Sequence, residues 1–165
     1  MPDLLTHLFF GTAILMLVYP KRRESWVLFL LGNIMVDFER PVSLFVKWLG
    51  WDWNYIGLFH SLLAVFFLAL SISFIIQSRA LTQKSRFLTL FYGGLAHLLA
   101  DLTLHPWPEI GIYLLYPIKI AFSFNLFWPG YIGYPIFAFG LLLISAGIRF
   151  WLLKKRKKDG IRNDD

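Results

Sequence analysis

Long hydrophobic stretches alternate with short polar breaks along this chain of 165 residues. Each stretch approaches the roughly 20 residues that an α-helix needs to cross a bilayer. The alternation therefore predicts an all-α, polytopic membrane protein, folded as a helical bundle of about five transmembrane helices. The expected spans cover residues 4–19, 26–48, 55–77, 87–105 and 131–153.

Residues 106–130 do not fit a full span, although they are rich in aromatic side chains. Pro106, Pro108, Pro117 and Pro129 interrupt this stretch, and proline breaks regular helices. Aromatic side chains favour the boundary between lipid and water. We expect a partly helical outer segment that is interfacial or re-entrant.

Lys and Arg gather at residues 21–23, 79–86 and 154–158, each group following a predicted span. Cytoplasmic loops carry such an excess of positive charge. The pattern predicts a multi-pass protein of the plasma membrane, with its N-terminus outside and its C-terminus in the cytoplasm. The first hydrophobic stretch precedes its charges, which argues against a cleaved signal peptide. We expect residues 1–153 to form a single transmembrane domain and residues 154–165 a basic cytoplasmic tail that contacts anionic lipid.

Composition supports this class. Hydrophobic residues make up 58% of the chain and charged residues 16%, whereas about a quarter of a soluble domain is charged. The net charge is +6, and the basic residues flank the hydrophobic spans. Too little chain remains to form a soluble domain that binds nucleic acid. Cysteine is absent, which excludes disulfides and thiolate metal sites. Any metal must be held by His, Asp and Glu.

Six ionisable side chains nevertheless fall inside or at the end of four of the spans. Each such group costs at least about 2.5–3.5 kcal/mol in a bilayer, so these groups are usually paired and functional. A lone histidine is more often a satisfied core residue, but that explanation does not extend to six groups. A rise of ~1.5 Å per residue puts all of them in the middle-to-outer part of the membrane. They are His7, Asp37, His60, His97, Asp101 and His105.

Three of these groups share the segment "YGGLAHLLADLTLHPWPE", residues 92–109. His97, Asp101 and His105 are four residues apart, so they form one stripe along a helix. Gly93 and Gly94 just before the stripe allow close approach of another helix. Nitrogen and oxygen ligands of this kind suit zinc. We expect the six groups to bind one or two divalent ions, with zinc preferred.

At this point the sequence resembles a family. The segments "DLLTHLFFG", "GNIMVDFER", "FHSLL", "GGLAHLLADLT" and "LLYP" are together similar to the YdjM-like group of predicted membrane-bound metal-dependent hydrolases, over about residues 1–120. Members typically show an N-terminal His, an Asp-x-Asp, a His-Ser pair preceded by another His, and a His-x-x-x-Asp. The residues that match are His7, Asp37, His60 with Ser61, and His97 with Asp101.

Two positions depart from the family pattern. Glu39 replaces the second Asp, a conservative change for a ligand or a base. Tyr55 stands where the extra His often occurs.

The order of these ligands also resembles, more distantly, zinc-dependent phospholipase C and the single-strand nuclease that shares its helical fold. By that analogy Asp37, His60, His97 and Asp101 hold one zinc ion. His7 and Asp101 share a second. Likeness at the level of fold does not establish an activity.

The resemblance implies an intramembrane metal-dependent hydrolase. The outer position of the site favours a lipid-linked phosphoester of the outer leaflet as the substrate. Glu39, or whichever Asp does not bind the metal, is the expected base that orients water. Arg40 is the nearest cation for a substrate phosphate. Pairing of Arg40 with Glu39 or Asp37 explains that arginine equally well.

Two other functions remain open at this level. A metal or proton transporter also carries His and Asp in the bilayer, although little polar sequence continues towards the cytoplasm. A non-catalytic membrane protein with a metal-stapled bundle is the third alternative.

Overall fold

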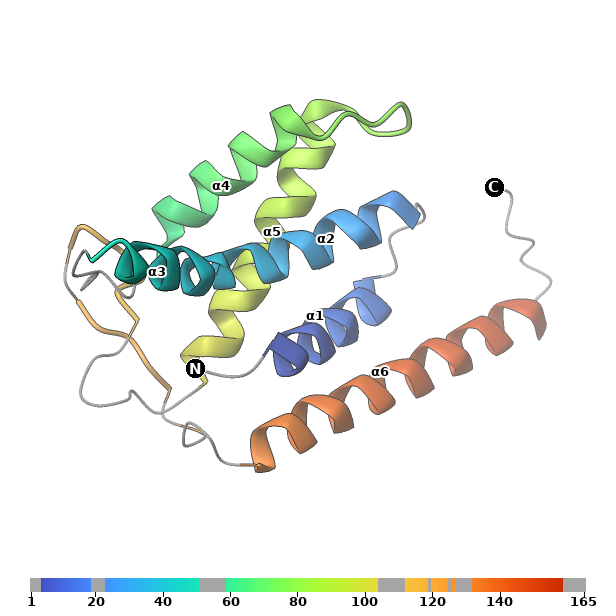
Figure 1. Ribbon diagram of the computed structural model, residues 1–165. Coiled ribbons are helices and arrows are strands. Elements are labelled where there is room, and N and C mark those ends of the chain that lie inside the picture. The colour runs from blue at the N-terminus through green and yellow to red at the C-terminus, as the bar shows by residue number, and fades with distance from the viewer. Residues whose placement is uncertain are drawn as a thin grey trace.

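The computed structural model describes residues 4–18, 23–50, 59–103, 112–118, 120–124, 126 and 132–158 (Figure 1). The side chains of residues 40 and 156–158 are outside this description. Within it, the chain is all-α, as predicted, and carries no β-strand beyond an isolated bridge between Ile112 and Phe122. The elements are α1 (Leu4–Val18), α2 (Arg23–Met35), the 3₁₀ turn η1 (Val36–Phe38), α3 (Glu39–Trp48), α4 (Leu62–Ile75), α5 (Gln83–Leu102) and α6 (Gly133–Lys158).

The helix boundaries differ from the prediction in two informative places. The expected span 26–48 is interrupted by η1, so that α2 and α3 are separate helices. Within the described part of the expected span 55–77, helix α4 begins at Leu62, where Ser61 caps it: the Ser61 Oγ accepts a hydrogen bond from the Ala64 amide at 3.2 Å. Such a cap satisfies an amide that has no partner in the first turn. His60 consequently lies just before α4 and not inside it.

Helix α5 is the centre of the molecule and packs against α1, α2 and α4, while α6 packs along α1. The main hydrophobic core lies between α2, α4 and α5 and includes Leu28, Met35, Val65, Leu90 and Leu98. This arrangement brings the N-terminal halves of α1 and α4 towards the C-terminal ends of α2 and α5 (Figure 1).

Glycine permits the closest of these contacts. A Cβ atom added to Gly93 on α5 would collide with the Phe29 carbonyl oxygen of α2. A Cβ atom added to Gly32 on α2 would likewise collide with the Leu90 backbone of α5. Small residues at an interface let two helix backbones approach closely, as is common between membrane helices. The α2–α5 contact is therefore one of backbone against backbone.

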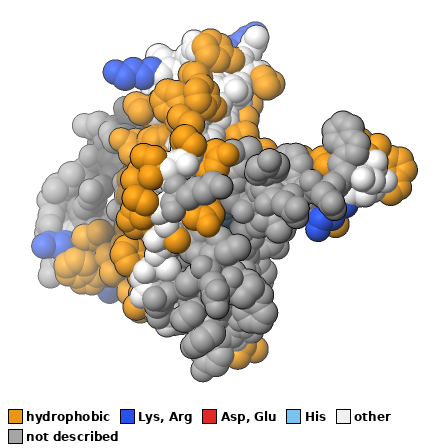
Figure 2. All heavy atoms as spheres, turned by 90° about the vertical axis from the view of Figure 1, so that its left-hand side faces the viewer, with side chains coloured by type: hydrophobic (Ala, Val, Ile, Leu, Met, Phe, Trp, Pro, Cys, Tyr) orange, Lys and Arg blue, Asp and Glu red, His pale blue; other side chains and the backbone are white. Residues whose placement is uncertain are grey.

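Much of the surface is hydrophobic. Helix α4 exposes Phe67 and Phe74, and α6 exposes Ile144 and Trp151. Figure 2 shows hydrophobic side chains across the described part of one face, with Lys and Arg at its margins. Among the described helices, only Gly133–Lys155 of α6 is long and apolar enough to cross a membrane by these measures, and α1 and α4 are apolar but shorter.

The basic side chains gather at one end of the helices. Arg23 begins α2, Arg79 lies in the turn between α4 and α5, Arg86 lies in the first turn of α5, and Lys154 lies near the end of α6. The start of α2, the connection between α4 and α5, and the end of α6 lie towards the right-hand side of Figure 1. Arg86 also closes this turn, since its Nη1 donates to the Leu81 carbonyl at 2.7 Å.

The described part of residues 106–130 forms turns and the isolated bridge and contains no helix. Their backbone groups are used at the ends of other helices instead. The amides of Phe124 and Leu126 donate to the carbonyls of Leu102 and Thr103, at 2.6 and 2.9 Å, at the end of α5. The segment thus supplies partners that the last turn of a helix lacks.

We predict that Gly93→Ala destabilises the protein by about 1–3 kcal/mol, the usual effect of overpacking, because the new methyl group meets the α2 backbone. Gly140→Ala on α6 is the control, since a Cβ atom there has no neighbour within 4 Å among the described residues. Thermal unfolding in detergent measures both. Equal melting temperatures for the two variants would contradict the close α2–α5 contact.

Candidate metal centre

Four side chains from three parts of the chain meet at one point. His7 comes from α1, His60 from the bend before α4, and His97 and Asp101 from successive turns of α5. All four are enclosed, with exposed fractions between 0% and 4%. The predicted stripe on α5 therefore faces the protein interior over its described part, His97 and Asp101.

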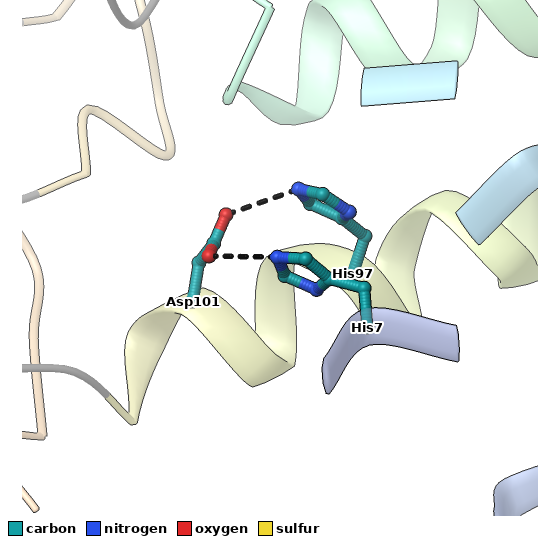
Figure 3. Close-up of side chains that lie close together, drawn as sticks. All are labelled: His7, His97 and Asp101. Atoms are coloured by element: carbon teal, nitrogen blue, oxygen red, sulfur yellow. Dashed lines mark ion pairs between the residues drawn. The ribbon is translucent and has the colours of Figure 1, made fainter. Parts of the chain in front are cut away.

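The Nε2 atoms of all three histidines face the carboxylate of Asp101. His7 Nε2 lies 3.3 Å from Oδ1, while His60 Nε2 and His97 Nε2 lie 3.4 and 3.1 Å from Oδ2. Figure 3 shows the first and last of these approaches. Tetrahedral zinc with nitrogen and oxygen ligands at ~2.0–2.2 Å separates neighbouring ligand atoms by about 3.3–3.6 Å. The observed separations are close to those of ligands around one small cation.

The orientation of His97 is fixed from behind by backbone. Its Nδ1 lies 2.6 Å from the Asn33 carbonyl oxygen. Because a carbonyl oxygen only accepts, Nδ1 carries a proton, and a neutral ring then presents the lone pair of Nε2 to Asp101. Two acceptors then face each other at 3.1 Å, an arrangement that a shared cation or proton stabilises.

His7 lies flat against His97, with ring centroids 3.7 Å apart and ring planes inclined by 12°. Neither nitrogen of His7 has a hydrogen-bond partner among the described residues. Buried polar atoms are normally hydrogen-bonded. The stacking keeps both rings parallel and directs both Nε2 atoms to the same carboxylate (Figure 3).

His60 has a carboxylate on each side. Its Nδ1 lies 3.1 Å from Oε2 of Glu39, which is itself 3% exposed, and its Nε2 faces Asp101. Glu39 is the first residue of α3, and the preceding 3₁₀ turn brings it to this position. The break in the second predicted span is thus the feature that brings Glu39 to His60.

Asp37 approaches the same histidines. Its carboxylate, one nitrogen of His60 and one of His97 lie within 4.8 Å of one another, as do the ligand atoms of His7, His97 and Asp101. The two groups share His97. Asp37 is half-buried, unlike the others. The arrangement provides nitrogen and oxygen donors for one or two divalent ions.

The chemistry of this donor set fits such an ion. Five of the six predicted ligands lie together, and the Nε2 atoms of His7, His60 and His97 converge on the Asp101 carboxylate. Burial of charged groups requires pairing or metal coordination. His105 lies outside the described residues, and so does the side chain of Arg40, although its backbone belongs to α3.

Asn33 and Tyr134 were not among the predicted site residues. With its amide oriented to satisfy both groups, the Asn33 side chain donates to the His7 carbonyl at 2.9 Å and accepts from the His97 amide at 3.3 Å. Tyr134 of α6 donates to the Ala100 carbonyl at 2.7 Å, next to Asp101. The sequence signal for Asn33 is a lone amide beside Gly32 in an apolar helix; Tyr134 has no comparable signal.

Comparison with known proteins gives one match. A family model described as YdjM inner membrane protein matches residues 1–159. No curated protein and no solved structure matches the chain. The more distant resemblance to the phospholipase and nuclease fold therefore remains a prediction.

We predict that the purified protein binds one or two zinc ions per chain and that His97→Ala or Asp101→Ala abolishes this binding. Zinc should also raise the melting temperature of the unaltered chain, since a ligand of the folded state adds to its stability, by about 2.7 kcal/mol at 100 times Kd. Thr89→Ala on the same helix is the control, because its hydroxyl bonds only its own helix, at the Ser85 carbonyl. Full metal occupancy in both site variants would exclude this centre.

Proposed function

The chain belongs to the YdjM inner membrane protein family, and from that premise we propose that it is an intramembrane metal-dependent hydrolase. Its substrate is a lipid-linked phosphoester at the outer leaflet, and its metal is zinc. The observation that carries the proposal is the convergence of three imidazole Nε2 atoms on the Asp101 carboxylate at 3.1–3.4 Å.

We further propose that the helices cross the membrane several times, with the N-terminus outside and the C-terminus in the cytoplasm. Two observations support this topology. The basic residues of the turns and of α6 share one end of the molecule, as the positive-inside rule requires. The candidate centre lies towards the other end of the same helices, near the start of α1 and α4 and the end of α5.

The metal would be held by His7, Asp37, His60, His97 and Asp101. One carboxylate oxygen of Asp101 lies near His7, and the other lies near His60 and His97. When bound, zinc supplies a Lewis acid that polarises a phosphoryl oxygen and favours ionisation of water. The surrounding core excludes bulk water, which strengthens every charge interaction within it. Arg40, on the first turn of α3, is the residue proposed to bind the substrate phosphate.

A lipid substrate fits the surroundings of the centre. Phe38 of η1 lies between Asp37 and Glu39 in the chain and is exposed, and α3, which begins at Glu39, exposes Leu44, Phe45 and Trp48. Lipid chains cover such surfaces favourably. A headgroup carried by the bilayer therefore reaches this part of the protein without leaving the membrane.

Transport is the weaker alternative. Between the centre and the basic end, the buried side chains of α1, α2 and α5 include Leu15, Phe29 and Leu90. A path for ions needs polar groups along its length, because charge in an apolar interior is costly.

We predict the topology from single cysteines, which the cysteine-free chain makes unambiguous. Cysteines placed at residues 78–86 or beyond residue 158 should be shielded from an impermeant thiol reagent in intact cells, and a cysteine at residue 54 should be labelled. The reverse pattern would refute the proposed orientation.

We predict that the detergent-solubilised protein releases phosphate or a phosphorylated headgroup from a mixture of bacterial phospholipids. Because the reaction depends on the metal, a chelator should stop release and added zinc should restore it. His97→Ala should abolish turnover, because it removes a proposed ligand of the metal, while Thr89→Ala should not change it. Mass spectrometry of the lipid products and a phosphate assay measure the reaction.

The same preparation distinguishes hydrolysis from transport. In sealed vesicles, a transporter would move zinc or protons across the bilayer and leave every lipid intact. Flux of this kind, together with bound metal and unchanged lipids, would refute the hydrolase proposal.

A further inference from the structure

We infer that Glu39 is a positioning residue for His60, not the base that the sequence suggested. It holds the imidazole so that Nε2 faces the metal position beside Asp101. This inference rests on the proposed metal function and assigns Glu39 a role within it.

His60 is not held within a helix. It lies in the bend that precedes α4, and the helix begins only after the Ser61 cap. His97, by contrast, is held in the middle of α5. The ring of His60 therefore needs a partner from another segment to fix its direction.

A hydrogen bond joins His60 to Glu39. An ionised carboxylate only accepts hydrogen bonds, so the 3.1 Å contact between Nδ1 and Oε2 assigns the proton to Nδ1. In the neutral ring, which is the form that binds a metal, the lone pair is then on Nε2, the atom that lies 3.4 Å from Asp101. A carboxylate behind a histidine in this way fixes both the ring direction and the tautomer of a metal ligand.

The Nδ1 atom of His97 has a different partner from that of His60. That ring is fixed by the Asn33 backbone carbonyl at 2.6 Å, which no side-chain substitution removes. The two histidines thus present Nε2 to the same oxygen of Asp101 through different supports. The support of His60 is a side chain, so it can be tested by mutation.

Glu39 lies in the protein interior. Its side chain is buried, and one oxygen already accepts from His60. A general base must reach the water that it activates. Asp37, two residues earlier, is half-buried as a residue, whereas Glu39 is 3% exposed.

The test measures zinc affinity by competition with a chelator, and the absorption spectrum after replacing zinc with cobalt. Loss of a carboxylate behind a metal-binding histidine typically weakens metal binding by 10–100-fold. We expect that loss in Glu39→Ala, together with a changed cobalt spectrum. Glu39→Gln keeps an oxygen that can accept from Nδ1, so it should restore part of the affinity. Glu24→Gln is the matched control, because that exposed carboxylate bonds Ser78 at the basic end.

The outcomes separate the two proposals. If the unaltered protein binds no metal, both fail. If it binds zinc and Glu39→Ala binds it equally well with the same cobalt spectrum, the positioning role is refuted and the metal centre stands. Unchanged affinity with lost turnover would return Glu39 to the role of base. Circular dichroism checks folding, and Glu39→Gln decides the question if the alanine variant does not fold.

Discussion

The close contact between α2 and α5 is the constraint on which the site depends. Because Gly32 and Gly93 have no side chains, the two backbones touch, and the carbonyl of Asn33 reaches Nδ1 of His97. The Asn33 side chain then joins the backbone of His7 to that of His97. Three helices are thereby held in register by polar contacts in an otherwise apolar interior. Such contacts are strong only when every group is satisfied, which explains why they are concentrated at one level of the bundle.

The electrostatics of the cluster follow from its burial. Asp101 is surrounded by three imidazoles, and Glu39 lies on the far side of one of them. Isolated, each of these groups would be expensive to place in a low-dielectric interior. Together they form an alternating arrangement of carboxylates and nitrogen ligands that a divalent cation would complete. The stability of the fold and the candidate centre therefore depend on each other. The buried ionisable residues, which would destabilise the bundle if they were isolated, are those that a metal would stabilise.

The sequence predicted the all-α class and grouped His7, Asp37, His60, His97 and Asp101, because the scarcity of ionisable residues in apolar stretches makes them conspicuous. It did not predict the 3₁₀ turn Val36–Phe38, since apolar residues on both sides of Asp37, Glu39 and Arg40 favoured one continuous span. That turn brings Glu39 to His60, so the role of Glu39 could not be inferred either. The role of Asn33 depends on a backbone carbonyl, whose direction is a property of packing and not of residue type. The number of spans and their orientation remain predictions.

The covering of the α5 terminus has a consequence for how this chain can vary. Phe124 and Leu126 meet the carbonyls of Leu102 and Thr103 through their amides, while their side chains are turned outwards and exposed. Any residue that keeps its backbone N–H can serve there, and proline cannot. Positions 124 and 126, which lie at the end of α5 close to the candidate metal centre, should therefore tolerate almost every side chain. A substitution scan should find proline harmful at both positions and most other replacements neutral.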